Sequence, residues 1–364
     1  MSLLWIALTK VKGLGTRKLA NLYKSFPNTS FEFLTDPSNF NHIKNCLKSE
    51  EIIELVTNRN YLKKEMTRAE EIVNNHKRLG IEIITIDDKL YPINLKSIQD
   101  PPIVLYCKGN IELLKQQKSI AIVGTRTPTD MGTRSAKRLS SVFAEMGYTI
   151  VSGLALGIDA AAHIGALRIR GNTIAVLAGG LDKVYPKENE TLANEIILNR
   201  GLLISETPVG GRTFKNSFVL RDRIQSGLSL GVCPVQTDIV GGTQHTIKFA
   251  KQQKRLLFCP EPQEKDVKQN RGIIQLIDNK EVEIVQSYDD YQKIEVLLQE
   301  VQESLFREEK DHSENSHPKI KKVRNQGLEA ELKLTLDKAC KLSTQLNIDI
   351  EQLKLLLEEQ YFSI

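Results

Sequence analysis

The sequence predicts an α/β fold whose largest domain is a doubly wound, mostly parallel sheet. The first observation is a rhythm of apolar β-type runs and amphipathic helices that continues from Ser119 to Cys259. The second is that glycine-rich turns follow four of the predicted strands, at the sheet edge where such folds bind ligands. The chain of 364 residues is long enough for two or three domains.

The segment from Ser119 to His163 contains one nearly complete βαβ unit. Ser119–Val123 is a short β-branched run, typical of a strand buried on both faces. After Asp130, apolar residues recur at three- and four-residue spacing until Gly147, which predicts an amphipathic helix. A second strand at 148–151 leads into another glycine-rich turn. Backbone amides at such a turn favour a phosphate.

The remaining elements follow in order along the chain. Further strands are predicted at Thr173–Leu177, Leu202–Ser205, 229–235 and 255–259, with helices at about 189–199, 218–226 and Thr243–Gln252. Two β-rich runs before this region, 81–86 and 103–107, could extend the edge of the sheet.

Four regions are expected. Residues 1–79 are predicted to be helical, and their turn Val-Lys-Gly-Leu-Gly at 11–15 is similar to the hairpin of helix-hairpin-helix or SAM-like modules. A simple helix-linking turn is an equally good interpretation. Residues 80–290 form a Rossmann-like domain, 291–326 a helical and polar linker, and 327–364 a small winged-helix-like module.

Composition is that of an ordinary globular protein. The net charge of +5 permits a polyanionic partner without demanding one. Five scattered cysteines, none in CxxC spacing, indicate neither zinc nor a disulfide framework and favour a cytoplasmic location.

No run is apolar enough for a membrane span, so we expect no membrane partner. GxGxxG and P-loop motifs are absent, and no cofactor or metal is predicted.

Four cations accompany the glycine-rich turns. Arg126 follows the first turn, Lys187 follows a later strand, and Arg221 and Arg223 lie near the start of a helix. Each alone is more often a solvated charge or part of an ion pair. Together they predict a groove suited to a phosphodiester backbone.

Stacking of bases would need exposed aromatic rings. Phe214 and Phe218, close to Arg221, are the candidates. Burial in the core is the favoured interpretation for at least one of them.

Support for catalysis is weak. Asp159 and His163 share a helix face, which permits an acid–base pair, but a hydrogen-bond network that holds the turn is the favoured interpretation. No nucleophile elbow or HExxH motif occurs, and we expect a protein that is not an enzyme.

Six ordered segments resemble one family. They read IVGTRTPTDMG, SGLALGIDAAAH, GNTIAVLAGGLDKVYPKEN, LLISETPVG, FVLRDRIQSGLS and VGGTQHTIKFAKQQKR. In order and spacing they are similar to the DNA-processing protein A family, also called DprA or Smf, over roughly residues 80–285. The resemblance implies a homodimer that binds and protects incoming single-stranded DNA and loads the RecA recombinase in natural transformation and recombination.

The resemblance also implies where DNA is bound. Arg126 and Lys187 match cations tied to phosphate contacts. The full set of implied phosphate-binding positions is Gly124, Arg126, Ser152, Gly153, Gly157, Lys187, Asn189, Arg221, Arg223, Gly241, Gly242 and Thr243.

The chain departs from the family pattern late in the match. Asp222 stands where the family usually has Asn between two Arg, and an acid there weakens a phosphate site unless it pairs with a neighbouring Arg. Gln236 replaces a usual Glu, and Gln244 and His245 belong to an altered turn.

An alternative is a nucleotide-binding enzyme. Gly241-Gly242-Thr243 is similar to the PGGxGTxxE turn of phosphoribohydrolases on a related Rossmann-like fold. The catalytic Glu of that motif would fall at Thr246 or Ile247, so the carboxylate is missing.

Overall fold

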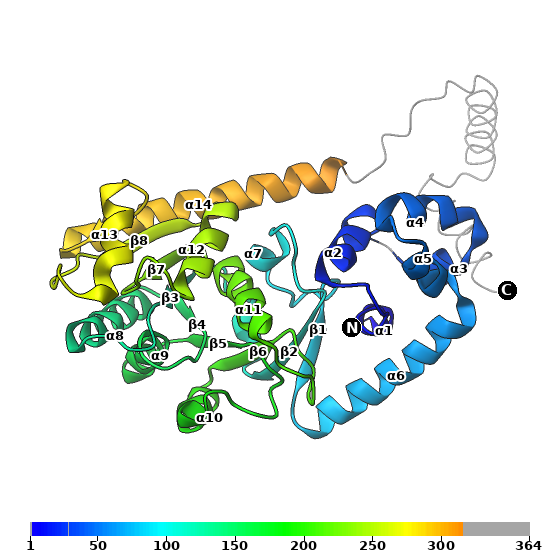
Figure 1. The fold of residues 1–364 in the computed structure, drawn as a ribbon, viewed down its shortest axis with the longest axis horizontal. Helices are drawn as coiled ribbons and strands as arrows, with labels where there is room; N and C mark the ends of the chain where they lie inside the picture. Colours follow the sequence, from blue (N-terminus) through cyan, green and yellow to red (C-terminus); the bar gives the residue numbers. More distant parts are fainter. Residues whose placement is uncertain (1, 28, 316–364) are drawn as a thin grey trace, which may run out of the picture. The chain divides into compact units, whose positions relative to one another are not determined.

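The α/β region is built on a nine-stranded sheet, seen in a computed structural model that describes residues 2–27 and 29–315, with side chains up to Arg307. Its strands are β1 (Glu82–Thr85), β2 (Val104–Gly109), β3 (Ser119–Val123), β4 (Thr149–Ser152), β5 (Thr173–Leu177), β6 (Leu202–Ser205), β7 (Gly231–Pro234), β8 (Leu256–Pro260) and β9 (Glu283–Val285). Figure 1 shows the sheet with helices on both sides. The predicted α/β fold class is confirmed.

The order of the strands is β1-β2-β6-β5-β4-β3-β7-β8-β9. From β3 the chain adds β4, β5 and β6 on one side and then returns to place β7 on the other. The neighbours from β6 to β9 are parallel, whereas β1 and β2 pair antiparallel at the edge. The two β-rich runs before Ser119 therefore do extend the sheet. The reversal between β3 and β7 is a topological switch point, where doubly wound sheets bind ligands.

Helices cover both faces of this sheet. They are α8 (Asp130–Glu145), α9 (Ile158–Arg168), α10 (Glu190–Leu198), α11 (Lys215–Leu228) and α12 (Thr243–Gln252). Because side chains alternate along a strand, Ile120 and Ile122 of β3 join the apolar cluster that contains Phe143 of α8. Ala121 and Val123 join the other cluster, with Ile224 of α11. The sheet is thus buried on both faces, which explains the uninterrupted apolar runs.

The N-terminal region is helical, as the sequence predicts. It comprises α1 (Leu3–Leu8), α2 (Thr16–Ser25), α3 (Phe31–Thr35), α4 (Phe40–Leu47), α5 (Glu50–Thr57) and α6 (Arg59–Arg78). Trp5 is fully buried, and its Nε1 donates to Asp87 beyond β1. His76 of α6 accepts a hydrogen bond from the Val209 amide at 3.0 Å and stacks on Tyr106 of β2. Residues up to Arg307 accordingly form one compact unit.

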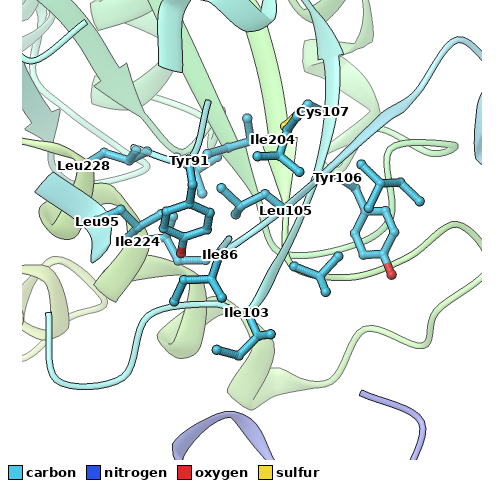
Figure 2. Close-up of a cluster of buried hydrophobic side chains, with 14 of the residues drawn as sticks. Ile86, Tyr91, Leu95, Ile103, Leu105, Tyr106, Cys107, Ile204, Ile224 and Leu228 are labelled. Carbon is cyan, nitrogen blue, oxygen red and sulfur yellow. The ribbon is translucent and has the colours of Figure 1, made fainter. Parts of the chain in front are cut away.

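A buried cluster joins the edge strands to the rest of the sheet domain (Figure 2). Leu105 of β2 lies there with Leu95 of α7 (Ile93–Lys96) and Leu228 of α11. The Tyr91 hydroxyl donates to the Pro102 carbonyl at 2.6 Å, which satisfies its polar end inside the core. Burial of this apolar surface fixes α11, which carries part of the site.

Helical structure continues across residue 290, where the sequence predicts that the linker begins. After α13 (Arg271–Asp278) and β9, the helix α14 runs from Tyr288 to Asn315. Its Tyr291, Ile294 and Leu298 are buried against the cluster of Phe143. The start of the predicted linker 291–326 is therefore helical and packs against the core. The expected module at 327–364 lies outside the described residues.

Candidate nucleic-acid interface

A cleft of about 720 Å³ opens at the switch point of the sheet. The turns after β3 and β7 and one face of α11 supply most of its walls. The residues that line it are Val123, Gly124, Thr125, Arg126, Ala155, Asp159, Tyr185, Lys215, Phe218, Val219, Arg221, Asp222, Gln225, Thr237, Asp238, Val240, Gly241, Gly242, Thr243, His245 and Thr246. The cleft lies at the ends of β3 and β7, the position that topology alone predicts.

The turn after β3 is held against the turn after β7. The Thr125 amide donates to the Gln236 carbonyl at 2.8 Å, and the Gln236 side chain accepts from the Thr129 amide at 3.0 Å. A Cβ on Gly124 would lie 2.9 Å from the same Gln236 carbonyl, so the close approach requires glycine. Gln236, which departs from the family pattern, has a positioning role between the two turns.

Gly153 leaves room for a guanidinium. Arg221 Nη1 donates to the carbonyl oxygens of Gly153 and Val176 at 2.7 and 2.8 Å, at the ends of β4 and β5. A Cβ on Gly153 would collide with that nitrogen. The Arg221 side chain lines the cleft, but its Nη1 is already hydrogen-bonded to the backbone beneath the cleft.

Two carboxylates are buried beside Arg221. Asp222 Oδ1 lies 3.2 Å from Arg221 Nε, so the acid at this position does pair with a neighbouring Arg. Burial raises the pKa of Asp222 to about 7 despite the opposing charge of Arg221. Burial also raises the pKa of Asp159, whose Oδ2 accepts from the Gly153 amide at 3.1 Å.

Aromatic and cationic groups meet at the mouth of the cleft. Arg126 Cζ lies 5.8 Å from the centroid of the Phe218 ring, and the Tyr185 ring lies 5.6 Å from Phe218. All three also line a neighbouring hollow of about 60 Å³. Arg126, Tyr185 and Lys215 are exposed to solvent. This arrangement presents both positive charge and ring surface, the two features that single strands require.

Several other predicted residues contribute to the cleft indirectly or lie apart from it. The Ser152 hydroxyl donates to the Ile122 carbonyl, and Asn189 Nδ2 donates to the carbonyls of Leu154 and Ala155. Both therefore hold the backbone in place. Gly157 has φ of +80° at the start of α9 and packs against the Thr125 carbonyl.

Arg223 faces away from the cleft. It is fully buried and makes a two-point ion pair with Glu206, at 2.8 Å for each oxygen. Phe214 is 63% exposed, and Lys187 is also exposed, but neither lines either hollow. Of the predicted residues, Gly124, Arg126, Phe218, Arg221, Gly241, Gly242 and Thr243 line the main cleft.

Sequence reasoning missed Tyr185 and Lys215 as lining residues. Lys215 begins α11 one turn before Phe218, a spacing that could have placed it on the same helix face. The position of Tyr185 depends on the path of a long turn, for which the sequence carries no comparable pattern.

Asp159 and His163 make separate contacts. His163 Nδ1 lies 2.7 Å from Thr173 Oγ1, and burial lowers the pKa of His163 to about 3. The pair therefore has the structural role that the sequence favours. At the position of the hydrolase Glu, Thr246 lines the cleft and Ile247 is buried.

Comparisons with known proteins give a consistent result. A family model described as DNA recombination-mediator protein A matches residues 82–295. Protein Smf of Synechocystis is 36% identical over 278 residues, which cover 76% of this chain and 68% of the relative. DNA processing protein DprA of Bacillus subtilis is 42% identical over 50% of this chain and 62% of its own length.

Solved structures agree with the sequence relatives. DNA processing protein A from Streptococcus pneumoniae superposes with a TM-score of 0.66 at 28% identity, covering 80% of this chain and 98% of that one. DNA processing protein A from Helicobacter pylori, whose structure was described for its single-stranded DNA binding mode, gives 0.53 at 30% identity, with coverage of 60% and 97%. No helix in the described part of the chain is long and apolar enough to cross a membrane.

Proposed function

Because the chain belongs to the DNA recombination-mediator protein A family, we propose that it binds single-stranded DNA along the cleft and transfers the strand to a RecA recombinase. The family is one of recombination mediators, not of enzymes. The observation that carries the proposal is the Arg126–Phe218 pair at the mouth of a cleft walled by glycine-rich turns. The described single-strand binding of the Helicobacter relative supports it.

Strand binding divides between two kinds of contact. Arg126 and Lys215 supply exposed charge for phosphates, and Lys187 extends the charge beyond the cleft. Gly241 and Gly242 are exposed where α12 begins, and backbone amides at such a helix start favour a phosphate. Phe218 and Tyr185 offer ring surface for bases.

The test is fluorescence anisotropy of a labelled oligonucleotide, single-stranded and duplex, across a salt series. We expect preference for the single strand and a steep loss of affinity with salt, because bound phosphates release counterions. Arg126→Ala and Lys187→Ala should each weaken binding, and Arg126→Ala should reduce the salt slope by about 0.7, the value for one phosphate on a single strand.

The matched control is Arg134→Ala, which removes an exposed charge of the same kind from α8 outside the cleft. It should leave affinity and slope unchanged. Equal weak binding of single strand and duplex, or equal effects of all three variants, would refute the proposed site.

Transfer to RecA and self-association are further parts of the proposal. We expect a homodimer, measured by light scattering of the full chain, and faster RecA assembly on a strand coated by single-strand-binding protein. This activity would protect and process incoming DNA in natural transformation. A monomer at all concentrations, or no effect on RecA assembly, would contradict these two parts without affecting strand binding.

A cytoplasmic location is proposed on the state of the cysteines. Cys46, Cys107, Cys233 and Cys259 are free thiols in the described part of the chain. A reducing compartment keeps such thiols unpaired. Cell fractionation would test this, and recovery of the protein from an extracellular fraction would contradict it.

A further inference from the structure

The cleft separates its charges by depth. Arg126 and Lys215 lie exposed at the rim, whereas Asp159 and Asp222 are 5% and 8% exposed in the interior. A phosphate is attracted by the rim and repelled by the interior. A bound strand therefore gains most when its backbone follows the rim and another part of a nucleotide enters the cleft.

Arg221 does not turn the interior into a phosphate site. Its Nη1 donates to two backbone carbonyls, and its Nε faces Asp222 Oδ1. The guanidinium is therefore already bound by groups of the protein itself. A phosphate in the interior would meet two buried acids and no unengaged charge from Arg221.

Asp222 keeps one oxygen available to a ligand. Within the described residues, its ion pair with Arg221 is made through Oδ1, and Gln225 can donate to the same oxygen at 3.1 Å. Oδ2 makes no hydrogen bond or ion pair in that part of the chain, and the Asp222 side chain, which is 12% exposed, lines the cleft. An ionised carboxylate only accepts hydrogen bonds, so its natural partner is an N–H group.

The cleft is large enough to admit a nucleotide base. The volume of about 720 Å³ falls within the range of roughly 300–1,000 Å³ typical of small-molecule sites. Phe218 and Asp222 are four residues apart on α11 and hence on the same face of the helix. A base that contacts the Phe218 ring is thereby brought within one helical turn of the carboxylate.

From these contacts, and resting on the proposed function, we propose that the cleft takes one base of the bound strand and that Asp222 selects bases with an exocyclic amino group. Adenine, cytosine and guanine carry such a donor, and acidic side chains accept from the cytosine amino group in known DNA readout. Thymine instead places carbonyl oxygens on both sides of its ring N–H, and these oxygens repel a carboxylate. Asp222 is thus a specificity-determining residue.

The test compares labelled oligo-dC and oligo-dT of equal length, bound by the full chain at about pH 8 and fixed salt. Both are pyrimidine strands, so backbone contacts are matched. The wild type should bind oligo-dC about fivefold to tenfold more tightly, near the lower end of what one side chain–base pair contributes. Asp222→Asn, whose amide both donates and accepts, should bring the ratio close to one, mainly by tighter binding of oligo-dT.

Asp182→Asn is the matched control, because it removes an exposed carboxylate that lines neither hollow. It should keep the wild-type ratio. Thermal unfolding of each variant verifies that the fold is retained.

The outcomes separate two failures. Tight binding of both strands with a ratio near one in the wild type, or an unchanged ratio in Asp222→Asn, overturns the base-selection proposal alone. Binding of neither strand overturns the proposed function as well. A wild-type preference that disappears only in Asp222→Asn supports both.

Discussion

The guanidinium of Arg126 lies over the ring of Phe218, with 5.8 Å between Cζ and the ring centroid. One residue belongs to the turn after β3 and the other to α11, so the contact spans the mouth of the cleft. Such a contact contributes about 0.5–1 kcal/mol at exposed sites and orders the long arginine side chain. Part of the entropy cost of strand binding is met before DNA arrives.

Removal of the Phe218 ring should weaken strand binding. Phe218→Ala deletes the stacking surface at the mouth of both hollows, and base–aromatic stacking contributes about 1–3 kcal/mol per base. We expect an affinity loss of roughly fivefold to a hundredfold by anisotropy. Phe214→Ala, at an exposed ring outside both hollows, is the comparison. A larger loss in Phe214→Ala would place the stacked base at the start of α11.

Two glycines of the cleft should respond differently to alanine. In Gly153→Ala the new methyl group would collide with Arg221 Nη1, displace it and leave two buried carbonyls without a donor. We expect a lower unfolding temperature and loss of strand binding. At Gly241 the nearest atom to a new Cβ is 3.7 Å away, so Gly241→Ala should keep the wild-type unfolding temperature. Equal melting temperatures of the two variants would contradict this assignment.

Arg223 should matter for stability and not for DNA. Arg223→Ala removes a fully buried cation and leaves Glu206 without its two-point partner. Loss of one member of a fully buried ion pair costs roughly 3–5 kcal/mol, and because the Glu206 side chain is 26% exposed we expect a smaller decrease here. Urea unfolding should show this decrease, whereas Arg212→Ala, at an exposed site, should not. If the folded Arg223→Ala protein lost strand affinity with unchanged stability, Arg223 would belong to the interface.

Strand binding should depend on pH through Asp222. Its pKa is raised to about 7 by burial, with Arg221 and Arg126 opposing and Asp159 adding to the shift. The carboxylate therefore takes up a proton as the pH falls from about 8 to about 6, and the cleft loses negative charge. Affinity for oligo-dT should rise over this interval.

Asp222→Asn is the reference for this experiment, because it replaces the titrating carboxyl group of residue 222 with an amide. The variant keeps His245, which also lines the cleft. The rise in affinity should be smaller in this variant than in the wild type. Identical pH profiles of the two proteins would show that Asp222 stays ionised throughout.

Much of the fold could be predicted from the sequence because buried parallel strands are short apolar runs, and β3 and β4 end directly at glycine. The strand Thr173–Leu177 and the helix Thr243–Gln252 occur with the predicted bounds. β9 and α13 were not predicted. The strand Glu283–Val285 has only three residues and is only partly buried, so it lacks the pattern that identifies the central strands.

The site was predictable in location but not in the role of each cation. Arg221 and Arg223 are two residues apart, and on a helix such residues project to different sides. That spacing could have indicated that only one of them faces the cleft. Whether Arg221 meets phosphate or backbone depends on the distance between β4, β5 and α11, which follows from the packing of the whole sheet domain.

The contact between Gly153 and Arg221 links the evolution of two distant positions. The guanidinium occupies the volume that a side chain at 153 would need. A larger residue at 153 is therefore compatible only with a shorter one at 221, and each single change passes through a destabilised intermediate. Among relatives with this cleft, the two positions should covary, and an arginine at 221 should accompany glycine at 153.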